Sequence, residues 1–149
     1  MSIPYDSFLG AFLSKISEYD FISLPDEDRN VIVDGYMKRA VAAFKKNCKY
    51  DLSSNADDES REFAVDIPET DADELIDIIS EGMVVQWLKP YVYKQELLEN
   101  TLNTRDFTTY SPAELLHRVG EAYKKAQRDY TQAIREYSYN NGKLSDLHL

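Results

Sequence analysis

The stretch Ser111–Tyr137, SPAELLHRVGEAYKKAQRDYTQAIREY, decides the fold because it predicts one long amphipathic helix. Three residues mark the N-terminus of this helix: Ser111 can cap it, Pro112 suits the first helical position, and Glu114 completes a Ser-x-x-Glu capping box. Apolar residues then recur at alternating steps of three and four, which keeps one narrow face apolar: Leu116, Val119, Tyr123, Ala126, Tyr130, Ala133 and Tyr137. Such a helix needs a surface to pack on.

Large rings alternate with small side chains along this face, because one row carries tyrosines and the other alanines. The pattern favours a helix packed mainly into its own bundle. At about 1.5 Å per residue the helix is about 40 Å long, more than a compact four-helix domain needs. We therefore expect part of it to project or to meet another subunit, with subunit packing assigned to Tyr123, Tyr130 and Tyr137.

The remaining apolar periodicity predicts a bundle of four to five helices, with an all-α fold. A short helix is expected over 5–16, a second from a cap at Ser23 to about Lys46, and a third from a cap at Thr70 to about Leu88. The third should be the most buried, since it is apolar around most of its circumference. Pro90 should end or kink it at Lys89, with a fourth helix over 91–102. Residues 1–137 are expected to form one domain, followed by an extended tail over 138–149.

The charge of the chain is concentrated in one segment. The net charge is −10, and residues 51–81 hold twelve of the 27 acids but a single base, Arg61. The segment 51–69 is expected to be an exposed, mobile acidic loop, with 63–67 extended along the bundle. This distribution of charge argues against a general DNA-binding role. The N-terminus lacks a signal peptide and no long apolar run exists, so the chain is expected to be soluble and not secreted.

Two patterns could hold a metal. Oxygen-bearing side chains occupy the calcium-loop positions between Asp51 and Glu62, but Ala56 stands where the loop needs glycine. A solvated acidic loop is the simpler interpretation. Glu114 and His117 have the spacing of di-metal helical bundles, yet no second copy exists and His117 lies on the polar side. No metal site and no cofactor is predicted.

Catalytic signatures are absent from the sequence. The single cysteine, Cys48, has no identifiable histidine partner, no glycine-flanked serine elbow occurs, and the five glycines form no phosphate loop. Basic residues on the outer face of the long helix alternate with acids, which is typical of a solvated face. The sequence therefore predicts a protein that is not an enzyme.

Several stretches together resemble the head-to-tail connector, or adaptor, proteins of tailed bacteriophages. They are WLKP at 87–90, RDF at 105–107, SPAELL at 111–116, YSY at 137–139 before an Asp-Leu tail, and GYMKRAVAAF at 35–44. The resemblance covers most of the chain and rests on the order of helices and on composition. The acidic loop over 51–62 departs from it.

The resemblance implies a structural adaptor of the phage neck: a ring, commonly a dodecamer, beneath the portal protein of the filled head. It would occur in the virion and, during assembly, in the host cytoplasm. The C-terminal tail would dock on the portal through Tyr139, Leu144, Leu147 and Leu149, and the lower face would meet the next neck or tail component. Viral DNA would pass through the ring, with acids of 51–81 lining the passage, where like charge limits sticking to phosphates.

Two other interpretations stay open at this stage. An acidic decoy or regulatory protein could occupy the nucleic-acid site of an enzyme, and would need a broad, regularly spaced acidic surface. A calcium-responsive helical module would need the loop over 51–62 to bind the ion.

Overall fold

The computed structural model of the chain describes residues 2–17, 29–93 and 112–141. Within these ranges the chain forms four α-helices: α1 (Tyr5–Ile16), α2 (Arg29–Phe44), α3 (Glu69–Tyr93) and α5 (Pro112–Asn141). Added to them are a 3-10 turn, η1 (Ser53–Asn55), and three short strands: β1 (Ile3–Pro4), β2 (Ala56–Asp57) and β3 (Glu62–Phe63). The predicted helical bundle with one long C-terminal helix is confirmed, whereas the all-α description omits a small sheet.

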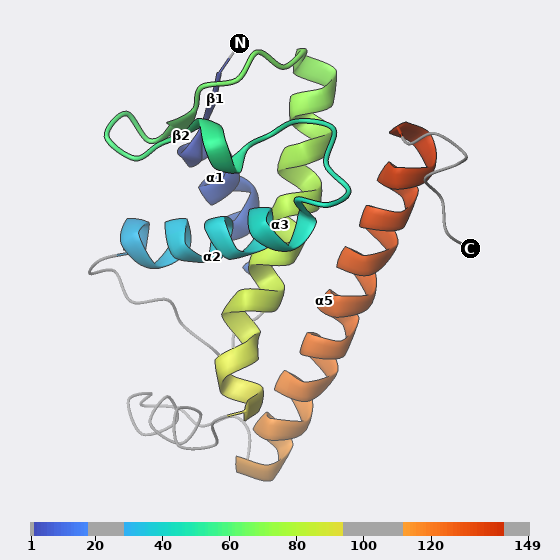
Figure 1. Ribbon diagram of the computed structural model, residues 1–149. Helices are drawn as coiled ribbons and strands as arrows, with labels where there is room; N and C mark the ends of the chain where they lie inside the picture. Colours follow the sequence, from blue (N-terminus) through green and yellow to red (C-terminus); the bar gives the residue numbers. More distant parts are fainter. Residues whose placement is uncertain (1, 18–28, 94–111, 142–149) are drawn as a thin grey trace.

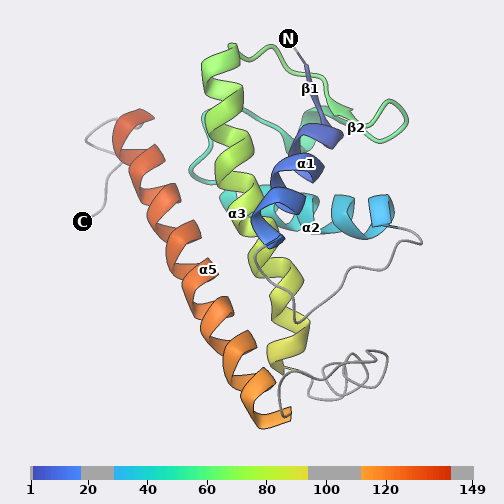
Figure 2. The same ribbon diagram turned by 180° about the vertical axis from the view of Figure 1, so that it is seen from behind.

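Helix α3 is the centre of the structure. The other three helices all pack on it, with α2 crossing it and α5 running along its other side (Figures 1 and 2). Its buried side chains lie around most of its circumference, which confirms the prediction that this helix is the most enclosed: Ala72, Leu75, Ile78, Ile79, Ser80, Met83, Val84, Val85, Trp87 and Leu88. The buried residues of all four helices form one continuous core.

Helix α1 agrees with its predicted bounds and packs through Phe8 and Phe12, both fully buried. The buried face of α2 is formed by residues three to four positions apart. Val33, Met37, Ala40, Val41 and Phe44 are buried, whereas Ile32 and Tyr36 are only partly covered. This helix ends at Phe44, two residues before the predicted end. Its predicted cap at Ser23 lies outside the described residues.

Both predicted ends of α3 are wrong. The amide of Ala72 donates to the carbonyl of Pro68 at 2.9 Å, so the helix starts before Thr70, which is not the cap. At the other end α3 continues through Pro90 to Tyr93. A proline removes one backbone hydrogen bond, and here core packing on both sides of it, by Leu88 and Val92, offsets that loss. Of the predicted fourth helix, 91–93 belong to α3 and 94–102 lie outside the described residues.

The acidic loop is ordered, contrary to the prediction. Its β2 and β3 form a hairpin, and β1 pairs with the other edge of β3, which gives an antiparallel sheet of order β1-β3-β2. Phe63 anchors this sheet, because its ring is buried against Tyr5 at 5.0 Å and Phe8 at 5.5 Å between centroids. Of the segment 63–67, which was predicted to be extended, only Phe63 belongs to a strand, because β3 covers Glu62–Phe63.

Helix α5 approaches α3 closely at a glycine. A Cβ on Gly82 would lie 2.7 Å from the ring of Tyr130 and 2.9 Å from the Cβ of Ala40, so α2, α3 and α5 meet here only because this position has no side chain. The helix extends to Asn141, about 45 Å for its 30 residues. The prediction of an extended tail is therefore wrong for 138–141, and 142–149 lie outside the described residues.

Candidate protein-binding site

The last turn of α5 presents an exposed aromatic side chain. Tyr139 is 72% exposed, and among the described large apolar residues only Val31 is exposed to the same degree. Two positions earlier Tyr137 is 3% exposed, so the helix is anchored to the core up to the point where Tyr139 leaves it. The other residues predicted to bind the portal, Leu144, Leu147 and Leu149, lie outside the described residues.

The three tyrosines predicted to pack between subunits are buried within the chain itself. The hydroxyl of Tyr130 donates to the carbonyl of Ala40 at 2.8 Å, and that of Tyr137 accepts from the amide of Lys49 at 3.0 Å. Tyr123 is 7% exposed and its hydroxyl accepts from Gln127. The interpretation of this face as core is confirmed, and contact between subunits through these rings stays a prediction.

Burial also makes these tyrosines sensitive to alkaline pH. It raises the pKa of Tyr130 and of Tyr137 to about 12, from an ordinary value of 10.0. The unfolded chain loses these protons first, so the folded state should lose stability as pH rises from about 10 to about 12. The free energy of unfolding, measured with urea at several pH values in this range, should fall more steeply with pH for the wild type than for Tyr130→Phe and Tyr137→Phe. Equal slopes for all three proteins would contradict the prediction.

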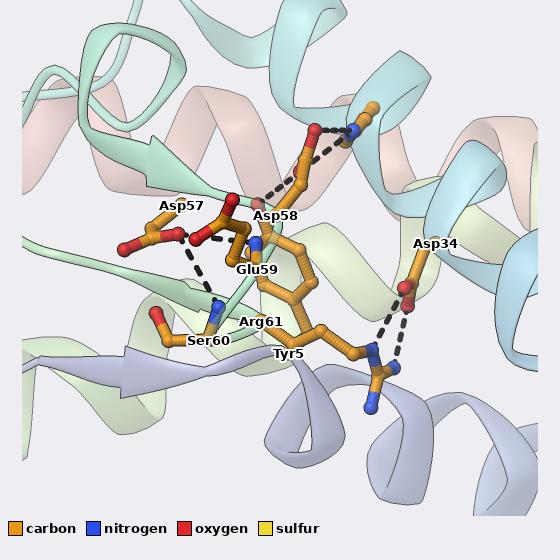
Figure 3. Close-up of polar contacts among 8 residues, drawn as sticks. Tyr5, Asp34, Asp57, Asp58, Glu59, Ser60 and Arg61 are labelled. Atoms are coloured by element: carbon orange, nitrogen blue, oxygen red, sulfur yellow. Dashed lines mark hydrogen bonds and ion pairs between the residues drawn. The ribbon is translucent and has the colours of Figure 1, made fainter.

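A polar network fixes the β2–β3 hairpin to the helices (Figure 3). The guanidinium of Arg61 makes two hydrogen bonds to Asp34 of α2, at 2.9 and 3.0 Å, and a third to Asp6 of α1 at 2.6 Å. Asp58 accepts from the hydroxyl of Tyr5 and from Lys38, both at 2.9 Å. These contacts tie one short turn to two helices, so the hairpin is held as a rigid projection.

The network is electrostatically matched. The hydrogen bonds that Lys38 and Tyr5 donate to Asp58 lower the pKa of this carboxyl, and the hydrogen bonds that Arg61 donates to Asp34 and Asp6 raise the pKa of the guanidinium. Arg61 itself has a φ of 53°, in the left-handed region that residues with a side chain seldom adopt. The ion pairs of Arg61 with Asp34 and Asp6 therefore stabilise a turn whose backbone conformation at Arg61 is unfavourable by itself.

The calcium-loop pattern is not assembled into a site. Asp51 accepts from the amide of Ser54, Asp57 accepts from the amides of Glu59 and Ser60, and Glu62 accepts from the hydroxyl of Ser2. These oxygens stabilise turns and the sheet. Across 2–17, 29–93 and 112–141, no group of three or more His, Cys, Asp or Glu is placed to hold a metal ion.

The surroundings of Cys48 and His117 do not favour catalysis or metal binding. The thiol of Cys48 is half-buried, and burial raises its pKa, which disfavours the nucleophilic thiolate. His117 is exposed on α5, as predicted from its place on the helix, and the nearby Glu114 pairs with Arg118 at 3.7 Å.

A surface hollow on α5 was not foreseen. It has a volume of about 510 Å³ and is lined by Gln127, Arg128, Thr131, Gln132 and Arg135, all exposed residues on the side away from α3. The sequence showed the arginines only as part of an outer face in which acids and bases alternate. The available signal was their spacing of seven residues, which places both on one stripe.

Comparison with known proteins gives no relative for this chain: no family model, no curated protein and no solved structure matches it. In the three described ranges, no helix combines the length and the apolar character that crossing a membrane requires.

Proposed function

We propose that this chain is a non-enzymatic structural adaptor of a tailed-phage neck, which forms a ring, docks on the portal protein and joins the head to the next neck or tail component. The observation that carries the proposal is the end of α5. A rigid helix, anchored in the core through Tyr130 and Tyr137, presents Tyr139 to solvent immediately before the tail.

An anchored arm with an exposed aromatic end suits recognition of a protein partner. Aromatic side chains bury a large area and lose little conformational freedom on binding, so they dominate many protein interfaces. Tyr139 would supply such an anchor, and Leu144, Leu147 and Leu149 would add apolar contacts with the portal. The resemblance to phage connectors in the order of helices supports the same assignment.

In this proposal, exposed acidic residues at the start of α3 face the DNA passage of the ring. Glu69 and Asp73, in the first turns of α3, are exposed and have no ion-pair partner among the described residues. Acids of this kind would line the passage through the ring, where negative charge keeps phosphates from sticking. A ring structure with this helix end wholly on the outer surface would contradict the assignment.

Deletion of residues 139–149 should abolish binding to the portal protein encoded by the same phage genome. The helical circular dichroism and the melting temperature should stay close to those of the full chain, because Tyr137 and the core residues before it remain. Binding is measured by co-elution with purified portal in size-exclusion chromatography. Portal binding retained by the shortened chain would contradict the proposed docking site.

Two matched point variants test whether portal binding depends on Tyr139 itself or on any exposed apolar side chain. Tyr139→Ser and Val31→Ser each remove an apolar side chain that is 72% exposed on a helix, in the last turn of α5 and near the start of α2 respectively. We expect Tyr139→Ser to weaken portal binding and Val31→Ser to leave it unchanged. Equal effects of the two substitutions would count against a specific role for Tyr139.

The alternative of an acidic decoy has less support. A decoy needs free, regularly spaced carboxylates, but many acids of this chain are engaged internally. Lys15 pairs with Asp77 and Glu81 at 2.8 and 2.9 Å, and Tyr50 donates to Asp71 at 2.5 Å. Together with Asp34 and Asp58 in the hairpin network, these groups stabilise the fold.

A further inference from the structure

The hairpin turn and the hollow on α5 carry opposite charges. At the turn, Asp57 and Glu59 are exposed and neither has an ion-pair partner within the described residues. The hollow on α5 contains Arg128 and Arg135, which also make no ion pair with any described residue. Lys124 extends the same stripe and lies 3.9 Å from Glu121. In a chain of net charge −10, Arg128 and Arg135 form a small basic patch on one helix face, beside Asp129, which pairs with Lys125, and Glu136, which accepts from Gln132.

These two surfaces lie on opposite sides of the molecule. The hairpin turn projects from the side of α1 and α2, whereas α5 forms the far side beyond α3, and the two views agree (Figures 1 and 2). The turn cannot reach the hollow of its own chain. Complementary surfaces on opposite sides allow each copy to contact the next one in the same way, which builds closed rings when the rotation between copies closes.

The hairpin turn is also held in one conformation by contacts within its own chain. The contacts of Arg61 with Asp34 and of Asp58 with Lys38 hold it against the helices, and Asp57 accepts from two backbone amides of the turn. A projection that is already rigid loses little conformational entropy when it binds. An acidic loop that only contacts solvent would not need contacts that hold it in one conformation.

We propose that the acidic turn of one copy, with Asp57 and Glu59, docks into the hollow of α5 on a second copy, beside Arg128 and Arg135. This inference rests on the proposed ring-forming function and names the surfaces between neighbouring subunits. The contact is heterologous: each copy offers its turn on one side and its hollow on the other.

Charge reversal on each side tests the contact. The full-length variants Arg128→Glu/Arg135→Glu and Asp57→Lys/Glu59→Lys are compared with the wild type by sedimentation velocity over a concentration series. Each variant should self-associate at least about tenfold more weakly, because close charge pairs across an interface carry substantial coupling. Mixing the two variants in equal amounts should restore association, since each reversed surface then meets its complement.

A control variant checks for the effect of net charge. Arg39→Glu/Lys46→Glu changes the charge by the same amount as the arginine variant, at exposed positions of α2 and the turn after it, outside the hollow. It should associate like the wild type. Failure of the mixed variants to associate, or a wild type that stays monomeric throughout the series, would overturn the proposal.

Portal capture by the same proteins separates this inference from the proposed function. Reversal of the arginines that weakens portal capture but leaves self-association intact would assign the hollow to the portal and overturn the inference. Restored association of the mixed variants, together with a wild type that does not bind portal, would leave this interface standing and contradict the adaptor function.

Discussion

Replacing Trp87 by alanine is expected to lower the free energy of unfolding by about 3–5 kcal/mol, the usual cost of deleting a large buried aromatic side chain. Trp87 is 1% exposed on α3, and Phe12 of α1 packs edge-to-face on it at 6.1 Å between centroids. The substitution would leave a cavity where α1 meets the central helix. Since small domains are stable by only about 5–15 kcal/mol, a large part of the total would be lost.

Urea unfolding followed by circular dichroism measures this effect, because Trp87 is the only tryptophan and its fluorescence is lost with it. Tyr139→Ala is the control: it also removes an aromatic side chain, but from a position that is 72% exposed. Its effect should stay within about 0.5 kcal/mol. A loss below about 1 kcal/mol for Trp87→Ala would show that α1 is not held on α3 as described.

Replacing Gly82 by alanine is expected to destabilise the fold by about 1–3 kcal/mol, the range found when extra atoms are forced into a packed core. The new methyl group would overlap the ring of Tyr130 at 2.7 Å and the Cβ of Ala40 at 2.9 Å. A shift of the ring away from this methyl group would strain its hydrogen bond to the carbonyl of Ala40. The better helix propensity of alanine opposes this loss but is smaller.

Gly120 provides the matched comparison, because it lies inside α5 and a Cβ there would meet nothing within 4 Å. Gly120→Ala should therefore stabilise the protein by up to about 1 kcal/mol. The two glycine substitutions should change the urea midpoint in opposite directions. Stabilisation by both would mean that α3 and α5 do not approach each other closely at Gly82.

Apolar periodicity was sufficient to predict the helices and the core face of α5. Of the seven residues that it placed on one face, Leu116 and Ala133 are partly buried and the other five are buried: Val119, Tyr123, Ala126, Tyr130 and Tyr137. The signal is strong because a mismatch at any of these positions would expose a ring or bury a charge. The prediction that α3 ends at Lys89 was wrong, because the effect of Pro90 depends on packing against residues far away in the sequence. A prediction from the proline alone does not take that packing into account.

The hairpin could not be predicted from its own residues. Its composition of Asp, Ser and Asn is typical of a loop, and the order comes from residues far away in the sequence: Tyr5, Asp6, Asp34 and Lys38. Arg61, the single base in the acidic segment, was the visible hint that some carboxylates need a partner. Its partners became apparent only once α1 and α2 were placed beside it.

The candidate binding site was predicted in part. Tyr139 was named from the sequence, and the structure places it exposed on the last turn of α5, although on a helix that runs to Asn141 instead of in an extended tail. The hollow around Arg128 and Arg135 was missed because a sequence pattern reports the sign of charges but not which of them find partners.

The central claim is that this chain is a ring-forming adaptor that docks on a portal protein. The most direct test is the molar mass, by size-exclusion chromatography with light scattering, of the complex formed when the full-length chain is mixed with purified portal of the same phage genome. The account predicts a particle larger than the portal by the mass of a ring of these chains. A portal that elutes with its own mass, while the chain elutes separately, would contradict it.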